Sequence, residues 1–329
     1  MADAYVRKLY VGVPAKLVLP KARTTAEKAL QLDPTLAEPH AALGLVKAGY
    51  DYDWTGAEAE FKRAIALNSG SALAHYYYSF GLIALGRDEE AIAEMKKAVS
   101  LDPLSPAMNA HLGSAFVYAR NYDQGIEQFK RTQELDPNLF YAHGGLMEAY
   151  EEKSMYPEAL AEFQRTAELS GYNARFLNDI NRAYENSGVT GYWQMRRRFI
   201  EESPNQANLP TEAAIAYART GDKERALQSL QKAMAQREFR LILLNVEPAF
   251  DSLHSDPRFQ DLLRRMNFPA DKSQLVQGKT GAGSMIVPAN FLGVNLIANP
   301  GAEDGEASTG YAPPSNIPGW TKTAGNFTV

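Results

Sequence analysis

Small residues and large apolar residues recur along this chain in a fixed order, in four successive units. Two apolar stretches separated by a turn predict two antiparallel helices per unit. Small residues allow the helices to approach closely, and a large apolar residue fills the space beside them. Counted from the residue after each turn, position 8 is Gly44, Ser79, Gly113 and Met147, position 20 is Ala57, Ala91, Gly125 and Ala159, position 24 is Phe61, Met95, Phe129 and Phe163, and position 30 is Leu67, Leu101, Leu135 and Leu169.

A short phrase marks the end of each unit. Leu-Asp-Pro occurs at residues 32–34, 101–103 and 135–137, and Leu67-Asn68-Ser69 stands where a further copy is expected. The turns recur every 34 or 35 residues, at Pro34, Ser69, Pro103, Pro137 and Gly171. Proline disfavours the helical conformation of the residue before it and suits the first turn of the next helix, so each Asp-Pro pair is expected to separate two helices. This period predicts stacked helical repeats, and hence a binding surface rather than a catalytic pocket.

Together these positions resemble the tetratricopeptide repeat (TPR) family over roughly residues 20–235. The resemblance implies an all-α fold, a right-handed superhelical solenoid of about six helix pairs with a closing helix, plus a short C-terminal β or irregular segment. The solenoid is expected over residues 1–270. Its units are expected at residues 2–36 (partial), 37–71, 72–105, 106–139, 140–173, 174–207 (degenerate) and 208–240, with the closing helix at 241–269.

Three features depart from the plain repeat. Residues 20–32 have the pattern of a repeat's second helix, so the chain is expected to begin inside a repeat and its natural parent to extend further toward the N-terminus. Trp193 stands at position 20 of the fifth unit, where a small residue is expected, and its bulk should loosen or rotate the stack. Asp256, followed by Pro257, is expected to cap the closing helix.

Some segments are more particular than a generic repeat. They are Tyr50-Asp51-Tyr52-Asp53-Trp54, the Leu-Gly-Arg-Asp-Glu-Glu-Ala sequence at residues 85–91, and the ending at 241–269. Here the chain is similar to the bacterial repeat arrays attached to winged-helix regulators and receptor-like protein kinases. That resemblance implies the sensing or interaction half of a regulatory protein, because these residues contain neither a kinase signature nor a DNA-reading domain.

The composition changes after Ala270. Residues 271–287 are polar and contain glycine, which predicts a linker, and residues 288–329 contain a short apolar run, an Asn-Pro-Gly turn and a Gly-Trp pair. The latter segment resembles the opening strands of secreted galactose-binding-like β-sandwich modules. It is too short to close such a sandwich. We expect either an incomplete, cut or disordered β-rich tail, or a strand donated to a partner sheet by self-association.

Charge and composition narrow the classes of function. The chain has 45% hydrophobic residues, 22% charged residues, a formal net charge of −5 and no cysteine, which rules out disulfides and thiolate chemistry. The basic run Arg196-Arg197-Arg198 is expected on a solvated helix face, so nucleic-acid binding is not expected. No apolar run approaches the ~18 residues of a membrane helix and the start is too polar for a signal peptide, so membrane insertion is not expected. The compartment stays open, with the cytoplasm as the default.

The sequence does not place its candidate catalytic or metal-binding residues in a pattern typical of an active site or a metal site. His40, His75 and His143 all stand at position 4, which packs between paired helices, so structural roles are expected and no metal or cofactor is predicted. His111 and His254 have no obvious partner. The acidic pairs Glu89-Glu90 and Glu151-Glu152 are expected to face solvent. A hydrolase remains only a third hypothesis.

The concave face of the solenoid is the predicted site. The first helix of each unit should line it, and the groove should run from an apolar, aromatic end to a charged end. The leading hypothesis is a non-enzymatic scaffold that binds a peptide or protein segment there, in a bacterial regulatory or assembly system. The alternative is a structural or surface-assembly protein, or part of a carbohydrate-binding module, acting through the C-terminal strands. The same pattern also fits a groove that binds the chain's own tail. The predicted groove residues are Leu73, Tyr76, Phe80, Ile83, Tyr118, Tyr141, Asn178 and Arg182.

Overall fold

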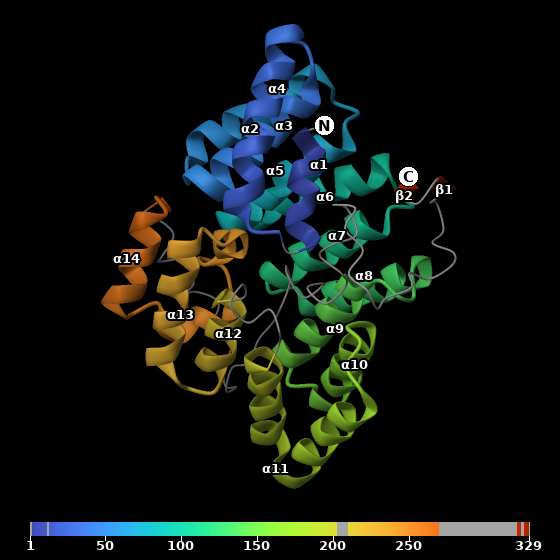
Figure 1. Ribbon diagram of the computed structural model, residues 1–329, viewed down its shortest axis with the longest axis vertical. Helices are drawn as coiled ribbons and strands as arrows, with labels where there is room; N and C mark the ends of the chain where they lie inside the picture. The colour runs from blue at the N-terminus through green and yellow to red at the C-terminus, as the bar shows by residue number, and fades with distance from the viewer. Residues whose placement is uncertain (1, 12, 203–209, 270–320, 324–325, 329) are drawn as a thin grey trace.

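The computed structural model describes residues 2–11, 13–202, 210–269, 321–323 and 326–328. Within them, helices form antiparallel pairs that stack into a curved array (Figure 1). The four regular pairs are α3 (Ala37–Val46) with α4 (Trp54–Leu67), α5 (Ala72–Ala84) with α6 (Asp88–Leu101), α7 (Pro106–Tyr118) with α8 (Tyr122–Leu135), and α9 (Phe140–Glu152) with α10 (Tyr156–Leu169). The predicted all-α solenoid of paired helices is confirmed.

Glycine and phenylalanine hold the two helices of a unit together at the positions that the repeat predicts. A β-carbon on Gly44 would lie 2.4 Å from the ring of Phe61, and one on Gly113 would lie 2.7 Å from the ring of Phe129. Both rings are buried, with at most 1% of their surface exposed. Because no real β-carbon comes so close, the glycine at position 8 makes room for the ring at position 24.

Short polar side chains fix where several helices begin. The hydroxyl of Ser71 accepts a hydrogen bond from the backbone N–H of Ala74 at 3.3 Å. Ser105 caps α7 in the same way. The carboxylate of Asp256 accepts a bond from the backbone N–H of Arg258 at 2.9 Å, and Pro257 occupies the first helical position, as predicted. These caps satisfy N–H groups that have no partner within the helix.

The N-terminal residues form α1 (Ala2–Arg7), the short 3-10 helix η1 (Lys8–Val11) and α2 (Ala15–Leu32). The predicted start of the second helix at Pro20 is wrong, because α2 begins five residues earlier and Pro20 lies inside it. A turn of π-helix, η2 (Lys47–Asp51), follows α3. The α1 helix reaches the second unit, where the hydroxyl of Tyr77 donates to the carboxylate of Asp3.

The fifth unit is one long segment, α11 (Ala174–Glu201), broken at Gly188. The break has φ 54° and ψ −136°, a conformation that glycine adopts without steric cost. Trp193, which was expected to loosen the stack, lies buried in the second half of α11 at 4% exposure. Its ring meets that of Tyr192 edge-on at 5.0 Å between centroids.

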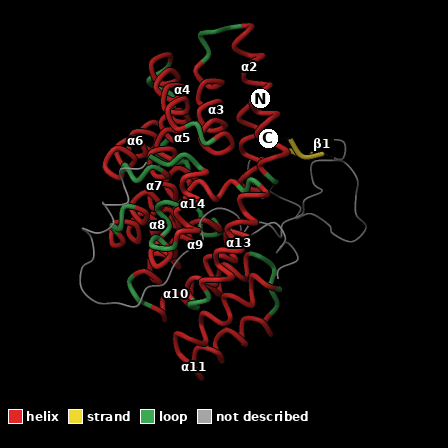
Figure 2. The backbone as a smooth tube through the Cα atoms, turned by 90° about the vertical axis from the view of Figure 1, so that its left-hand side faces the viewer, coloured by secondary structure: helices red, strands yellow, loops and turns green. Residues whose placement is uncertain are grey.

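After α11 the chain turns back toward the middle of the array. Figures 1 and 2 show α14 (Pro257–Arg265) at mid-height of the molecule, between the N-terminal helices and α11 rather than beyond α11. The sixth pair is α12 (Pro210–Arg219) with α13 (Lys223–Gln236). The single closing helix predicted over residues 241–269 is wrong. Two 3-10 helices, η4 (Phe239–Leu243) and η5 (Pro248–Leu253), precede α14 (Pro257–Arg265), because each proline lacks an N–H and starts a new helical segment.

The residues that follow α11 and turn back contact the first unit. The indole N–H of Trp54 donates to the carbonyl oxygen of Met266 at 2.8 Å, and the Trp54 ring stacks on Phe268 at 4.8 Å between centroids. The guanidinium of Arg237 lies over the ring of Tyr50 at 4.8 Å. Residues about 200 positions apart in the sequence are therefore packed together, and the solenoid is closed on one side.

Two short strands lie near the C-terminus. β1 (Thr321–Thr323) pairs antiparallel with β2 (Asn326–Thr328), with Lys322 opposite Phe327. The predicted linker and most of the predicted β-rich segment fall outside the described residues. Of the helices that the structure describes, none combines the length and apolar character needed to span a membrane.

Candidate interaction groove

The predicted groove residues lie on the first helices of units two to five. Tyr76, Phe80, Ile83 and Tyr118 are buried, with 5–6% of their surface exposed. Tyr76 packs on His111 of the next repeat, and Phe80 packs on Phe239 of the C-terminal part of the chain, so these side chains are not free on the concave face. Leu73 and Tyr141 are half-buried, and Asn178 and Arg182 are exposed. The role of all eight in binding a partner stays a prediction.

An aromatic side chain of η4 fills the apolar end of the groove. The ring of Phe239 stacks on Phe80, with 5.6 Å between centroids and 9° between planes. A β-carbon on Gly49 would lie 2.3 Å from the Phe239 ring, so only glycine leaves room for the ring there. The groove therefore contains a shaped seat for one aromatic side chain, made by α5 and η2.

A row of aromatic rings continues along the same face. The Tyr76 hydroxyl and His111 Nε2 lie 2.7 Å apart, and the rings of His111 and Tyr141 lie 6.5 Å apart between centroids. Burial lowers the pKa of His111 to about 4, so its imidazole is neutral at physiological pH. The partner of His111 was not evident from the sequence, since Tyr76 lies one repeat earlier.

Three carboxylates of α9 face the returning segment. The expectation that Glu151 and Glu152 face solvent is wrong, because their side chains are 0% and 7% exposed. The Tyr192 hydroxyl donates to Glu151, whose carboxylate also lies 3.6 Å from Arg196 Nε. Arg196 is likewise buried rather than solvated, at 3% exposure. We call Glu148, Glu151 and Glu152 the α9 carboxylates.

The arginines of the C-terminal residues face these carboxylates. Arg219 of α12 donates to Glu152 at 2.8 Å. Arg240 of η4 lies 3.1 Å from the carboxylate of Glu212 and 3.3 Å from that of Glu247, and both of these acids are at most 2% exposed. Half-exposed Arg120 and Asp251 pair at 3.1 Å at the edge of this cluster.

The buried cluster contains more acids than bases. Its five carboxylates face three guanidinium groups, those of Arg196, Arg219 and Arg240. Burial raises the pKa of Glu151, of Glu152 and of Glu212 to about 7, against the opposing effect of the arginines. Burial also raises the pKa of Glu148 well above its ordinary value, and both Glu148 oxygens lack a hydrogen-bond partner among the described residues. The five acids are Glu148, Glu151, Glu152, Glu212 and Glu247.

The histidines at position 4 form a recurring pair with a glutamate of the second helix. The Nδ1 atoms of His40, His75 and His143 lie 2.6, 2.5 and 2.6 Å from the carboxylates of Glu60, Glu94 and Glu162. In the third unit, Asn109 and Gln128 take the same two positions and bond at 2.9 Å. The predicted location between paired helices is confirmed. Among the described residues, no group of histidine, aspartate and glutamate side chains is arranged to hold a metal ion.

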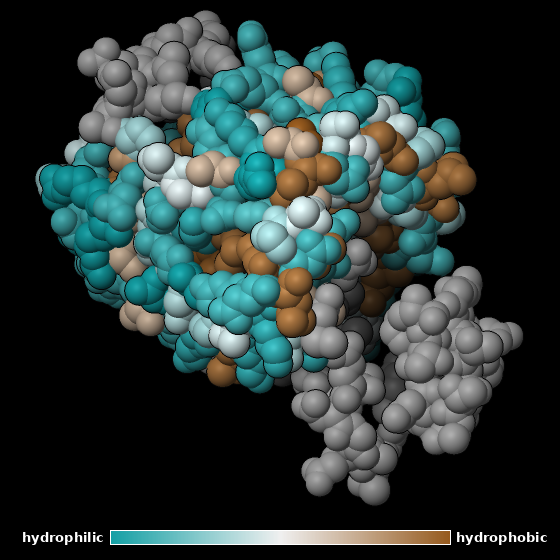
Figure 3. All heavy atoms as spheres, turned by 90° about the horizontal axis from the view of Figure 1, so that it is seen from above, coloured by the Kyte–Doolittle hydropathy of each residue, from teal (hydrophilic) through white to brown (hydrophobic). Residues whose placement is uncertain are grey.

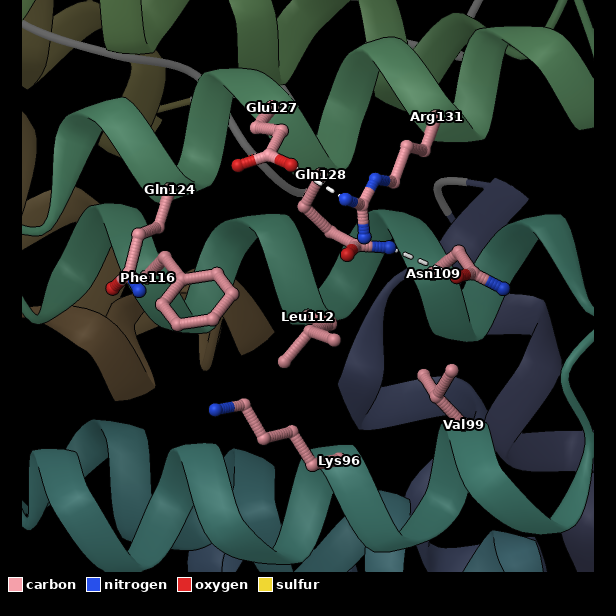
Figure 4. A pocket seen from close by; sticks show the side chains of 9 residues that line it. All are labelled: Lys96, Val99, Asn109, Leu112, Phe116, Gln124, Glu127, Gln128 and Arg131. Atoms are coloured by element: carbon pink, nitrogen blue, oxygen red, sulfur yellow. Dashed lines mark hydrogen bonds and ion pairs between the residues drawn. The ribbon is translucent and has the colours of Figure 1, made fainter.

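A second concavity lies on the opposite, convex side, between α6 and α8 over α7 (Figure 4). Its volume is about 440 Å³. Lys96 extends over the ring of Phe116 at 5.5 Å, and Arg131 pairs with Glu127 on the rim. On its polar floor the amides of Asn109 and Gln128 bond to each other at 2.9 Å, so these two groups do not demand a ligand.

Apolar side chains outside the groove are scattered. Leu32 and Leu104, in the turns between units, are 81% and 76% exposed. Seen from above, the surface shows small hydrophobic groups among hydrophilic residues (Figure 3). Isolated exposed leucines are ordinary on soluble domains, so they do not indicate a second interface.

Known proteins resemble this chain through its repeats. A family model described as tetratricopeptide repeat matches residues 48–106 and 111–174. The crystal structure of the APC/C hetero-tetramer Cut9–Hcn1 is similar with a TM-score of 0.51 and 16% identity, covering 80% of this chain and 48% of that one. Pseudomonas aeruginosa PilF has a TM-score of 0.47 and 23% identity, covering 63% of this chain and 94% of its own.

A third similar structure is that of a protein described by its peptide-binding site. YrrB, "a TPR protein with an unusual peptide-binding site", has a TM-score of 0.37 and 19% identity, covering 67% of this chain and 95% of that one. No curated protein matches the sequence. The finer resemblances, to the arrays of winged-helix regulators and kinases and to galactose-binding modules, stay predictions. The period, the helix pairs and the matched residues together show that this chain contains tetratricopeptide repeats stacked as an α-solenoid.

Proposed function

We propose that this protein is a non-enzymatic scaffold that binds a peptide or protein segment in the concave groove formed by α5, α7, α9 and the first half of α11. One observation supports this most directly. The groove face already holds a polypeptide segment, η4, through the stacking of Phe239 on Phe80. A face that seats one segment by aromatic stacking and charge pairing has the chemistry needed to bind another.

The buried acids of the groove suit recognition better than catalysis. Carboxylates with pKa values near 7 can act as general acids or bases when a substrate reaches them. Glu151 and Glu212 are at most 1% exposed, and both face arginine side chains. Such groups instead favour a ligand that brings positive charge into the groove.

A selection from a phage-displayed random peptide library tests this proposal. The full chain is the bait, and peptides are ranked by affinity against two double variants. Asn178→Ala/Arg182→Ala changes the exposed end of the groove, and Lys97→Ala/Arg131→Ala changes the convex face as the matched control. We expect the groove variant, and not the control, to lose about tenfold or more in affinity. Peptides that bind all three proteins equally would contradict groove binding.

The assembly alternative is favoured by one observation, the hairpin of β1 and β2. A short hairpin has unpaired outer edges that can pair with another strand. Light-scattering mass of the full chain and of residues 1–270, measured over a concentration series, separates the two functions. Assembly of the full chain alone would support a strand-pairing role, whereas two monomers would exclude it over that concentration range.

A further inference from the structure

The segment that fills the groove has two faces. Phe239, Ile242 and Leu243 belong to the core formed by the repeats, and Val246 packs against that core. Leu241 and Leu244 belong to a second core. Residues 239–246 therefore lie as a layer between two hydrophobic cores, one on each side.

The second core belongs almost entirely to the C-terminal residues. Its buried members come from α12, α13, η4, η5, α14 and the residues between them, with Tyr52 as the one exception in the described part of the chain. We call residues 210–268 the C-terminal unit. A unit with a core of its own can keep its packing when it separates from its neighbour.

The junction between the C-terminal unit and the groove differs from either core. Beside the Phe239 seat it contains the five carboxylates and three guanidinium groups described above. Separating two apolar surfaces exposes them to water, whereas separating charged groups returns them to the solvent that favours them. The charged groups of the junction therefore offset part of the cost of exposing Phe239, Ile242 and Leu243 when it opens.

The bound segment also leaves the groove incompletely satisfied. Arg240 reaches Glu212 and Glu247, which both belong to the C-terminal unit. Glu148, on the groove side, keeps two buried oxygens without a hydrogen-bond donor among the described residues. Arg240 acts on Glu148 through its charge alone, so a ligand that brought a cation within hydrogen-bond distance of Glu148 would add a bond that the described part of the chain does not make.

We propose that residues 239–247 are an intramolecular ligand of the groove, and that the external partner is a segment with an aromatic residue, an adjacent arginine and a second basic side chain. The aromatic residue takes the seat of Phe239 against Phe80 and Gly49. The arginine takes the place of Arg240 and faces the α9 carboxylates, since Glu212 and Glu247 leave with the C-terminal unit, and the second cation pairs with Glu148. This inference rests on the groove-binding function proposed above and adds to it the chemistry of the partner and the competition by the chain itself.

The junction can be locked closed by a cross-link between two introduced cysteines, because the sequence contains no cysteine of its own. In the full-length double variant Arg120→Cys/Asp251→Cys, one new thiol lies on the groove side and one on the C-terminal unit, at the half-exposed pair. A short bis-maleimide cross-links the two and keeps the groove filled. The two substitutions remove the ion pair in both labelled proteins, and a monofunctional maleimide, which caps the thiols without cross-linking them, gives the matched control.

The probe is a fluorescein-labelled peptide with the sequence of residues 236–249, followed by fluorescence anisotropy. We expect the mono-maleimide protein to bind it about tenfold or more tightly than the cross-linked protein. A probe with alanine in place of Phe239 and Arg240 should bind the mono-maleimide protein about tenfold more weakly than the parent probe. Equal binding by cross-linked and mono-maleimide proteins, or by the two probes, would overturn the proposal.

Folding of each labelled protein is checked by circular dichroism. If the double-cysteine chain is not folded, Arg120→Ala replaces it, because that variant also removes the pair with Asp251, together with the bond between Arg120 and Tyr122. It should bind the probe more tightly than wild type, and unchanged affinity would count against the proposal.

The second cation is tested in the mono-maleimide protein with one more probe, the same peptide carrying an additional lysine at each position in turn. At least one lysine position should raise affinity severalfold, and Glu148→Gln should abolish that gain. A gain that persists in Glu148→Gln, or the absence of any gain, overturns this part.

The outcome also separates this inference from the proposed function. Library peptides that bind the cross-linked and mono-maleimide proteins equally would leave the scaffold function intact and reject the intramolecular ligand. If the 236–249 probe binds and no library peptide does, the intramolecular ligand is supported and the scaffold function is rejected.

Discussion

Two buried regions of this molecule are built from opposite chemistry. Inside the repeats, each unit packs small residues against one large side chain, as Gly113 packs against Phe129. At the junction between the groove and the C-terminal unit, charged side chains are as deeply buried as those rings. The comparison teaches that burial alone does not define a permanent core. The repeats are specified by local pattern, and the junction is held by groups whose charge and partners can change.

The largest expected effect is a break in the repeat interior. Phe129→Ala removes a ring that is 0% exposed and leaves Gly113 facing a cavity, so we expect the free energy of unfolding to fall by about 3–5 kcal/mol. Urea denaturation followed by circular dichroism measures it. Leu104→Ala, at a residue 76% exposed, is the control and should change stability by less than about 0.5 kcal/mol.

Removal of one cation tests the junction in the same way. Arg240→Met keeps most of the side-chain volume and leaves Glu212 and Glu247 buried without their arginine. We expect a loss of roughly 3 kcal/mol in unfolding free energy at pH 7, and less at pH 5, where both acids can take up protons. Arg131→Met, which loses only an exposed pair with Glu127, should be nearly neutral. Equal losses in the two variants would mean that the cluster is not held by charge.

The junction and the repeats should also respond differently to pH. A carboxyl whose pKa is higher in the folded than in the unfolded protein stabilises the fold at low pH, and that contribution is lost as pH rises from its unfolded to its folded value. The pKa values of Glu151, Glu152 and Glu212 rise from 4.5 to about 7, so the unfolding free energy should fall between those pH values, by up to about 1.4 kcal/mol per pH unit for each of these carboxyls. The charged or titratable groups that face them include Tyr118, Arg120, Tyr122, Glu148, Tyr156, Tyr192, Arg196, Arg219, Glu238, Arg240, Glu247 and Asp251.

One repeat histidine gives the internal reference for that experiment. Burial lowers the pKa of His143, but its bonds to Glu162 and to the carbonyl of Pro137 outweigh this, so the net pKa is raised above 6.5. Its stabilisation is complete below 6.5 and is lost only as pH rises through the higher folded value. Denaturation from pH 4.5 to 6.5 therefore excludes the contribution of His143, whereas His111 and His254, whose pKa values are lowered by burial, add a change of opposite sign to that of the carboxyls. A flat profile there would show that the carboxyls do not titrate as proposed.

A finer test compares two carboxylates on one helix. Glu148 lacks a hydrogen-bond partner among the described residues, whereas Glu152 accepts a bond from Arg219 at 2.8 Å. Glu148→Met should therefore raise the unfolding free energy by about 1–3 kcal/mol, and Glu152→Met should lower it by a similar amount. Thermal denaturation at pH 7 distinguishes the two. Destabilisation by Glu148→Met would imply a partner for Glu148 that the described residues do not include.

The repeats could be predicted from the sequence, and the junction could not, for a physical reason. Positions 8, 20 and 24 of one unit contact each other within about 20 residues, and the same contact recurs each time, so the period reveals it. The burial of Phe80 depends on Phe239, which belongs to no repeated position. One signal was present. Arg240 interrupts the apolar run from Phe239 to Leu244, and a cation in such a run must find buried acids, which Glu212 and Glu247 supply.

The smallest expected effect concerns the polar pair inside each unit, because two units of this chain already carry different pairs at the same positions. The third unit has Asn109 and Gln128 where the fourth has His143 and Glu162, and both pairs link the two helices while also bonding the preceding turn, at Pro103 and at Pro137. His143→Asn/Glu162→Gln should therefore change unfolding free energy by less than about 1 kcal/mol at pH 7, because donor and acceptor are replaced together. His143→Asn alone mismatches the amide with a charged carboxylate and should cost more. Urea denaturation at pH 6 and pH 8 separates the effects, since the double variant should lose the pH dependence that His143 contributes and keep that of the junction. If the double variant is as unstable as the single one, the pair is not interchangeable, and the repeats are less uniform inside than their period implies.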